Sequence, residues 1–363
     1  NNQKDILVNV ANLVISDSKF SNNNVFKCIY TNYLEMINCE FVNNTANEKR
    51  TSDVGNLIYL DLKDQQGIIS GTSFENNSVY QGCIYVKSSN FNQGLDIADS
   101  VFINNTGEGR GGCLAADSSS TDNYQIKISS SVFINNYASA GSVAYVMKKC
   151  VLTAVNSIFL GNKQKLPSLG DVFSTVGNSA SFVLDNNWWG NTAENAADSP
   201  RKGLNNWLFL NVTSNVDKLN FSENAIITVD LANVITSKGE ISKYDAGDKL
   251  PLDTLNITSI NGIATAVSDK FIDGKLQVIF TPTATGEASV TTNLYSVTST
   301  LKFDVSKAFT NLNIYTKDIK VKEDLVIKVA LESSRPTGTV TVKINNKDYT
   351  IDLVNGTGVT TIS

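Results

Sequence analysis

Histidine is missing altogether from the 363 residues of this chain, and proline, methionine and cysteine are scarce, at 5, 2 and 5 residues. Without histidine the chain cannot form a Ser-His-Asp triad, a Cys-His dyad or a histidine-ligated metal site. Charged residues are also few, at 18% of the chain, and the formal net charge is −5. Because nucleic-acid binding needs a basic surface, this balance argues against a nucleic-acid partner.

Long apolar runs are missing too. No stretch of 18 or more apolar residues occurs, so we expect no transmembrane segment. The chain begins in a polar stretch with neither a start methionine nor a leader, which predicts that it is a piece of a longer protein. Apolar residues nevertheless make up 41% of the chain, and its length predicts two or three domains with a sizeable core.

The cysteines all lie in the first half of the chain. An odd number cannot pair completely within one chain, and no Cys-x-x-Cys spacing marks a metal or redox site. We therefore expect buried free thiols that pack as small apolar side chains, and we expect no metal and no cofactor. The five residues are Cys28, Cys39, Cys83, Cys113 and Cys150.

A pattern of the form Ser-x-Phe-x-Asn-Asn recurs through the first half of the chain, with a mean period of 28 residues. The copies are followed by an alternating apolar run that opens with a glycine and a small residue, as in Gly82-Cys-Ile-Tyr-Val86, although the first run, Lys27-Cys-Ile-Tyr30, lacks the glycine. Another alternating stretch precedes the next phenylalanine. Three short strands in each repeat, without helical periodicity, predict the coils of a parallel β-helix. We expect about seven coils over residues 1–191, stacked roughly 4.8 Å apart.

Equivalent side chains of successive coils should lie above one another and form two inward columns. One column would stack aromatic rings, and the other would be a ladder of buried amides that bond to one another and to the backbone. The aromatic column comprises Phe20, Phe41, Phe74, Phe102, Phe133, Phe159 and Trp188. The amide column comprises Asn23, Asn44, Asn77, Asn105, Asn136, Asn162 and Asn191. We interpret the pair Trp188 and Trp189 as a cap over the last coil, with a sugar-stacking site as the other interpretation.

A leucine-rich repeat also has a similar period and an asparagine column, and it is the alternative fold. It would need leucine two residues before the phenylalanine position, where this chain carries serine, cysteine or threonine. It would also need leucine shortly after the asparagine, which is missing. The β-helix is therefore the prediction.

The second half of the chain has a different pattern. Residues 192–203 are small, polar and contain proline, and they predict a linker. Short strand-like runs then follow at about ten-residue spacing, so residues 204–306 predict an immunoglobulin-like β-sandwich without an inter-sheet disulfide. A second such unit occupies residues 307–363, too few for a complete sandwich, so its remaining strands would lie beyond the chain or come from another one. The expected fold class is all-β throughout.

The coils that close on Asn187-Trp-Trp-Gly-Asn191 resemble the right-handed, pectate-lyase-like β-helix of archaeal adhesin-like proteins, large surface proteins of methanogens. Residues 205–213 look like the start of the bacterial-type immunoglobulin-like domains of that family, and residues 334–342 are similar to a repeat of those domains. The resemblance implies a secreted cell-surface product with many coils and tandem stalk domains. It brings no catalytic residues with it.

An enzyme that acts on polysaccharides is the alternative function, since many β-helices are lyases or hydrolases. A lyase would need calcium-binding carboxylates and a basic side chain on one strand face. The candidates are Arg110, with Glu108 in the same turn, and Asp61 and Asp117 in adjoining coils, but we expect these acidic residues at unmatched coil positions. The glycine-rich run 107–112 lacks the Lys-Ser/Thr of a phosphate-binding loop. We therefore expect no enzyme and no catalytic residue.

Seven Asn-x-Ser/Thr sequons are candidates for glycosylation, and the first three should face outward. They are Asn43, Asn76, Asn104, Asn211, Asn220, Asn256 and Asn355.

The expected function is that of an extracellular, cell-surface, adhesin-like protein that presents a rigid β-helix on stalk domains. Its partners would be a polysaccharide or protein of another cell, or copies of itself, contacted through coil insertions at 47–54 and 117–123. A surface filament whose subunits exchange strands is a further alternative.

Overall fold

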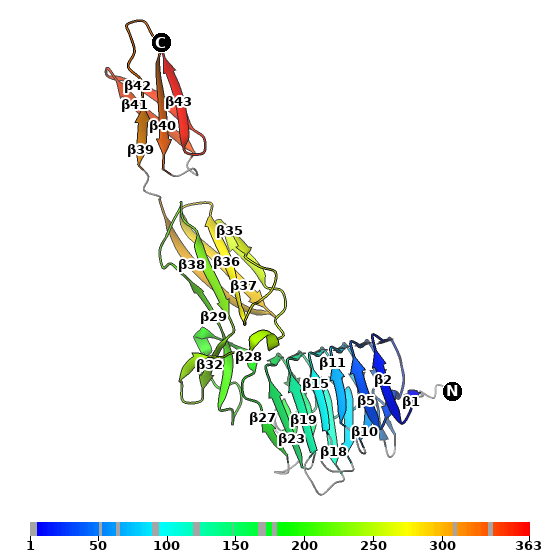
Figure 1. The fold of residues 1–363 in the computed structure, drawn as a ribbon. Coiled ribbons are helices and arrows are strands. Elements are labelled where there is room, and N and C mark those ends of the chain that lie inside the picture. Colours follow the sequence, from blue (N-terminus) through cyan, green and yellow to red (C-terminus); the bar gives the residue numbers. More distant parts are fainter. Residues whose placement is uncertain are drawn as a thin grey trace.

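The computed structural model describes residues 6–50, 53–62, 66–88, 94–118, 124–147, 149–165, 172–175, 180–307, 311–332 and 337–363. Within these ranges the regular structure is β-strand, apart from the short 3-10 helices η2 (Ala193–Asn195) and η3 (Gly247–Lys249). Figure 1 shows a stack of strands near the N-terminus, followed by two smaller strand-built units. Parts of the segments 47–54, 117–123 and 334–342, named above, lie outside the described residues.

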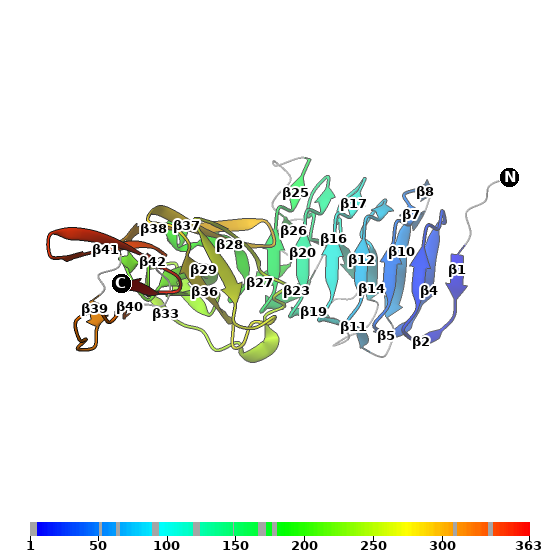
Figure 2. The ribbon, with the colours of Figure 1, turned by 90° about the horizontal axis from the view of Figure 1, so that it is seen from above.

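The stack is a parallel β-helix, and Figure 2 shows its strands following one another along one axis. The first sheet contains β1 (Ile6–Asn9), β4 (Lys27–Thr31), β10 (Asn56–Leu62), β14 (Ile84–Ser88), β18 (Leu114–Ser118), β22 (Ala144–Val146) and β26 (Phe173–Thr175). The second contains β2 (Asn12–Ser16), β5 (Tyr33–Ile37), β11 (Gly67–Ser70), β15 (Gly94–Ala98), β19 (Tyr124–Ser129), β23 (Cys150–Val155) and β27 (Ser181–Val183). Seven strands in each sheet match the expected seven coils.

The repeated pattern forms the third sheet, and a narrow fourth sheet follows it in each coil. The third begins with β3 (Lys19–Ser21), β6 (Glu40–Val42), β12 (Ser73–Glu75), β16 (Val101–Ile103), β20 (Val132–Ile134), β24 (Ile158–Leu160) and β28 (Trp188–Thr192). The fourth contains β7 (Thr45–Ala46), β13 (Ser78–Val79), β17 (Thr106–Gly107), β21 (Tyr137–Ala138) and β25 (Lys163–Gln164). A small hairpin of β8 (Lys49–Arg50) and β9 (Asp53–Val54) projects from the second coil.

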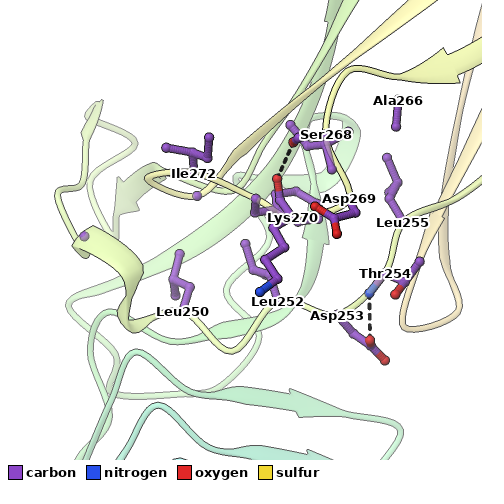
Figure 3. A pocket seen from close by; sticks show the side chains of 14 residues that line it. Leu250, Leu252, Asp253, Thr254, Leu255, Ala266, Ser268, Asp269, Lys270 and Ile272 are labelled. Atoms are coloured by element: carbon purple, nitrogen blue, oxygen red, sulfur yellow. Dashed lines mark hydrogen bonds between the residues drawn. The ribbon is translucent and has the colours of Figure 1, made fainter.

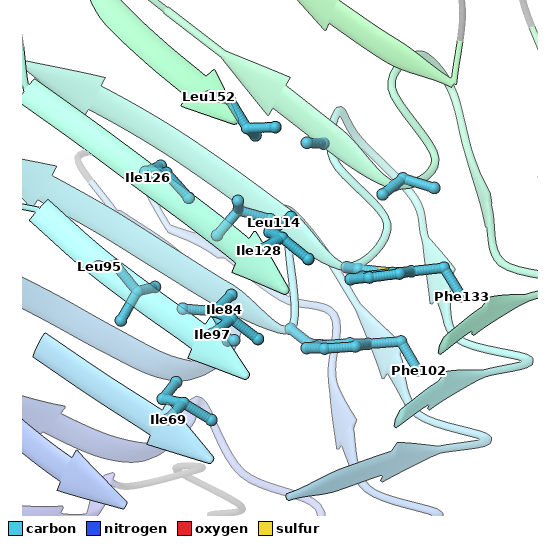
Figure 4. Close-up of a cluster of buried hydrophobic side chains, with 14 of the residues drawn as sticks. Ile69, Ile84, Leu95, Ile97, Phe102, Leu114, Ile126, Ile128, Phe133 and Leu152 are labelled. Carbon is cyan, nitrogen blue, oxygen red and sulfur yellow. The ribbon is translucent and has the colours of Figure 1, made fainter. Parts of the chain in front are cut away.

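The six phenylalanines of the expected aromatic column stack ring on ring. Centroids of successive rings from Phe20 to Phe159 lie 4.6–5.2 Å apart. Figure 4 shows Phe102 and Phe133 one above the other, with the aliphatic side chains of the other sheets around them. Phe102 has no exposed surface, and burying such a ring stabilises the fold by about 1.5–3 kcal/mol.

The second asparagine of each copy forms a buried ladder. From Asn23 to Asn162, each Nδ2 donates to the Oδ1 of the asparagine in the next coil at 2.9–3.0 Å. The backbone N–H of the same residue donates to that oxygen too. From Asn44 onward, Nδ2 also donates to a phenylalanine carbonyl of the preceding coil at 2.8 Å. Since every interior amide is bonded on both sides, none bears the cost of an unpaired buried group.

The first position of the pattern forms a second ladder, which the sequence analysis did not foresee as hydrogen-bonded. In each step a backbone N–H donates to the side-chain oxygen at the same position of the next coil, at 2.8–3.3 Å. Its members are Cys39, Thr72, Ser100, Ser131, Ser157 and Asn187. This bonding explains why small hydroxyl side chains prevail at a buried position.

The last copy of the pattern is shifted by one residue from the expected alignment. β28 pairs Trp188 with Ile158, so Trp189 follows Phe159, with ring centroids 4.8 Å apart. Trp188 belongs instead to the core on the other side of the third sheet. Asn191 also leaves the amide ladder, because its Nδ2 donates to the carbonyls of Asn195 and Asp198. The doublets Asn-Asn and Trp-Trp fit either alignment, and the second ladder, which ends on Asn187, selects this one.

Left-handed backbone turns flank the strands of the third sheet. The first asparagine of each copy has φ between 54° and 56°, and Gly161 takes the same place with φ 62°. Asparagine and glycine adopt this conformation more readily than other residues do. The alternation of asparagine with glycine at this position is therefore a backbone requirement. The asparagines are Asn22, Asn43, Asn76, Asn104 and Asn135.

This requirement gives a test at Asn76, which is exposed and has φ 54°. We expect Asn76→Ala to lower the free energy of unfolding by about 1–2 kcal/mol, the cost of a left-handed alanine. Asn76→Gly should cost little, although it loses the same side-chain bond from Asn104. Urea unfolding of the two variants measures the difference, and equal losses would contradict a backbone origin.

The third sheet does not end with the β-helix. β28 pairs in parallel with β29 (Asn206–Ser214), and the far half of β29 pairs antiparallel with β31 (Ala225–Asp230). One strand is thus both the last rung of the β-helix and the first strand of a sandwich, so the third sheet runs through 13 strands. Alternate side chains of β29 face the two cores, with Trp207 in that of the β-helix and Leu208 in that of the sandwich.

Residues 192–203, expected to be a linker, fold against the end of the β-helix. They contain η2, and Ala196 beyond it is buried in the core of the β-helix. Trp207 Nε1 donates to the Ala196 carbonyl at 2.9 Å. The segment therefore helps to close the last coil.

The sandwich encloses a core between two sheets. One contains β29, β31, β36 (Lys275–Pro282) and β35 (Gly262–Ala266); the other contains β30 (Leu219–Asn220), β38 (Val297–Ser306), β37 (Gly286–Leu294) and β34 (Asn256–Ile260). β32 (Asn233–Thr236) and β33 (Ile241–Lys243) lie beside β29. The core also includes Ile158 and Trp188 on the outer face of the third sheet, so the two units share a hydrophobic contact.

The described residues of the last unit, 311–332 and 337–363, form five strands and a small core of their own. β39 (Leu312–Tyr315), β40 (Leu325–Leu331) and β43 (Thr357–Ile362) form one sheet, and β41 (Gly338–Ile344) and β42 (Lys347–Leu353) form a hairpin. The all-β fold class is thereby confirmed, with parallel sheets followed by smaller, mostly antiparallel ones. The described ranges contain no helix with the length and apolar character that crossing a membrane requires.

Candidate binding surfaces

The outer face of the first sheet carries a column of tyrosines. Tyr30, Tyr59 and Tyr85 occupy matching positions in successive coils, and their ring centroids lie 5.1 Å apart. All three side chains are half-buried. Ala115 follows in the next coil and Tyr145 in the one after. The column gives this face an aromatic strip that runs parallel to the axis of the β-helix.

Arg110, a candidate for catalysis, lies beside this strip. Its Nη1 donates to the hydroxyl of Tyr145 at 2.6 Å, and its guanidinium lies 5.0 Å from the centroid of that ring. Glu108 faces elsewhere and accepts a bond from the side-chain amide of Asn47. The guanidinium of Arg110 is therefore held against the aromatic strip, whereas the carboxylate of Glu108 bonds to Asn47 of another coil.

The other two candidates share one column, contrary to expectation. Asp61 pairs in register with Lys87, and Lys87 with Asp117, two residues beyond the tyrosine column. The carboxylates are thus two coils apart, roughly 9.6 Å at the spacing of neighbouring strands. This match is not apparent from the sequence, because the insertions between coils differ in length. Within the described residues, no three Cys, Asp or Glu side chains gather closely enough to hold a metal ion.

The five cysteines are all buried and free. Burial raises the pKa of Cys28 and of Cys150 to about 12, and it raises the pKa of Cys83 and Cys113 as well. Because the thiolate is the reactive form, these side chains are poor nucleophiles.

We expect none of the four deeply buried thiols to react with Ellman's reagent in the native protein at neutral pH. All five cysteines should react once the chain is unfolded in guanidinium. The folded-state pKa values exceed the unfolded value of about 8.5, so the unfolded chain loses these protons first and stability should fall as pH rises above that value. Rapid labelling of the native protein would show that the interior of the coils is open.

The first three sequons lie where the pattern placed them. Asn43, Asn76 and Asn104 are exposed, one coil apart, on the left-handed turns described above. The Nδ2 of Asn104 donates to the Oδ1 of Asn76 at 3.2 Å. Asn256 and Asn355 are exposed as well, whereas Asn211 and Asn220 are half-buried. Among the seven sequons, these five exposed ones present their side chains to solvent.

A cavity of about 880 Å³ opens in the sandwich, between η3 and the segment that follows β35 (Figure 3). Leu250, Leu255 and Leu276 are nearly buried and form its apolar lining. Asp269 and Lys270 are exposed at its rim, and in the described part of the chain no ion pair includes either. Sequence reasoning missed this cavity, because its lining comes from loops without a recognisable motif.

No model of a known protein family matches this chain, and no curated protein matches its sequence. Two solved structures are similar to part of it. The adhesin InvE of Yersinia pseudotuberculosis is 14% identical over 41% of this chain and 50% of its own, with a TM-score of 0.24. Domains 5–6 of the S-layer protein SbsC are 12% identical over 42% of this chain and 91% of theirs, with a TM-score of 0.21. This chain thus spans about half of the adhesin chain, and neither TM-score indicates a common overall fold.

Proposed function

We propose that this chain is a non-enzymatic, extracellular protein of the cell surface, in which the sandwich holds the β-helix out as a stiff, adhesin-like rod. The observation that carries the proposal is the shared strand β29. It belongs to both units, and its alternate side chains are buried in both cores. Rotation of one unit against the other would break backbone pairing and expose apolar surface, so this junction is built to transmit force and orientation.

The interior of the β-helix supports the same function. The ladders bond every coil to the next through side chains as well as backbone, and the rings stack along the same axis. Such an interior makes the β-helix stiff and resistant to proteases. The lack of histidine and the raised pKa of the thiols leave few groups suited to nucleophilic or general-base catalysis. The resemblance to archaeal adhesin-like proteins fits this picture, and the partner would be a polysaccharide or protein of another cell.

Antibody labelling of the organism that encodes the chain tests the location. We expect intact cells to be labelled, with no increase when the cells are permeabilised. Treatment of intact cells with protease should remove the signal. Labelling that appears only after permeabilisation would contradict the proposal.

A carbohydrate-active enzyme is the second candidate, favoured by the column of Asp61, Lys87 and Asp117 beside the tyrosine strip. The strands that carry the two carboxylates are about 9.6 Å apart, just above the carboxylate separation found in inverting glycosidases, about 6.5–9.5 Å. Assays on acidic polysaccharides, with and without calcium, test this candidate. We expect no turnover. Turnover that Asp117→Asn abolishes, and that Lys127→Ala on the second sheet leaves intact, would replace the first proposal.

A further inference from the structure

One side of the sandwich is closed by an arch of two successive strands, β34 and β35, which are joined at Asn261, lie in opposite sheets and are both sheet edges. β34 pairs only with β37, and β35 pairs only with β36, so each leaves one row of backbone groups facing outward in the described structure. Residues 256–267, which contain both strands, include no charged residue and no proline. Ile260, Ile263 and Val267 are 64%, 61% and 58% exposed.

Natural sheets protect exposed edges with charge, proline, bulges or short strands, because an open edge pairs with other chains. Other edge strands of this sandwich are protected in these ways. β30 has only two residues and follows Lys218, and β33 contains Lys243. The β34–β35 arch carries neither a charge nor a proline. An apolar edge of this kind is expected to be covered in the working protein.

We propose that a second copy of this chain covers it, through antiparallel pairing of β35 with β35 of the other copy about a twofold axis. Such pairing is self-complementary, as a twofold interface must be. Each copy carries a net charge of −5, but residues 256–267 are uncharged, so no like charges meet along the paired edges. The inference goes beyond the proposed function and does not depend on it.

The cavity of the sandwich supports a second copy over an unrelated strand. It lies at the base of the arch, where Leu255 precedes β34 and Ala266 ends β35, whereas Ile260 lies at the tip of the arch. An antiparallel pair centred on Ala264 brings the tip of each copy to the mouth of the cavity in the other. One arch thus supplies both an exposed isoleucine and an apolar hollow, and the twofold symmetry brings them together twice.

Sedimentation velocity of the full chain over a concentration series tests the proposal. We expect a reversible dimer that becomes tighter as salt screens the net charge, because the contact itself is apolar. Ile263→Lys should abolish the dimer, because it places a charge in each half of the contact. Ile241→Lys is the matched control, since Ile241 is 62% exposed on β33, and it should leave the dimer intact.

Cross-linking provides a second readout that does not depend on a disruptive substitution. In the proposed register Ile263 lies opposite Thr265 of the other copy, so the double variant Ile263→Cys with Thr265→Cys should form disulfide-linked dimers under mild oxidation. The wild-type chain should form none, because its own cysteines are buried. A wild-type chain that is monomeric at every concentration, a dimer that survives Ile263→Lys, or a double variant that does not cross-link would overturn the proposal.

Discussion

Phe102→Ala should lower the free energy of unfolding by about 3–5 kcal/mol, the range found when a buried phenylalanine is truncated to alanine. Phe102 has no exposed surface, and its ring lies 4.6 Å from that of Phe74 and 4.7 Å from that of Phe133, between centroids. The coils above and below are held apart by backbone pairing and by the amide ladder, so they cannot close the gap. The loss of stability should therefore include most of the free energy that an unfilled cavity costs, in addition to the lost burial of the ring. Urea unfolding followed by far-ultraviolet circular dichroism measures it.

Phe20→Ala is the matched control for this variant. Phe20 has one stacked neighbour, Phe41, and its side chain is only partly buried in the first coil. The same truncation should cost clearly less there. Equal losses for the two variants would show that the stack does not confer the stability that we assign to it.

Asn105→Ala should cost about 3 kcal/mol, because it breaks the ladder on both sides at once. The Oδ1 of Asn105 accepts from the backbone N–H and the Nδ2 of Asn77, and its own Nδ2 donates to the carbonyl of Phe74 and to Asn136. Two buried donors and two buried acceptors lose a partner, but the Nδ2 of Asn77 keeps its bond to the Phe41 carbonyl and the Oδ1 of Asn136 keeps the backbone N–H of residue 105. The loss should therefore lie at the upper end of the range of about 1–3 kcal/mol that an unsatisfied buried group costs. Thermal and urea unfolding of the variant measure the loss.

Asn104→Gly is the control for this variant, since residue 104 is the exposed neighbour on the left-handed turn with φ 55°. Glycine keeps that backbone conformation, and only an exposed bond to Asn76 is lost. We expect a small effect. A loss at position 104 as large as that at position 105 would contradict the assignment of the second asparagine as the inward one.

The interior of the β-helix follows closely from the sequence, because each coil repeats the same side chains at nearly the same places. The aromatic and amide columns from Phe20 to Phe159 and from Asn23 to Asn162 are visible as a period alone. The alignment of the last copy was wrong by one residue, because the doublets around Trp188 fit two registers and only the hydrogen bond from Ser157 to Asn187 chooses. That bond depends on the fold and leaves no separate signal in the sequence.

The surfaces follow less well from the sequence. Asp61 and Asp117 come into one column because insertions of unequal length loop out between coils, and a period count cannot place residues across such insertions. The strand β29 falls wholly within the expected sandwich, whereas in the structure it also pairs with the β-helix, because its alternation of large apolar residues fits either neighbour. The cavity near Leu250 arises from loops that meet only in the folded sandwich.

The most direct test of the account is the distance between spin labels placed along one outward column. Val14, Lys127 and Val183 are exposed and occupy matching positions of the second sheet. Lys127 lies four coils from Val14, and Val183 lies six coils from Val14. Pulsed electron paramagnetic resonance on the cysteine pairs 14/127 and 14/183 should give narrow distributions near roughly 19 Å and roughly 29 Å, because each coil adds about 4.8 Å. Broad distributions, or a second distance no longer than the first, would contradict a continuous stack of coils.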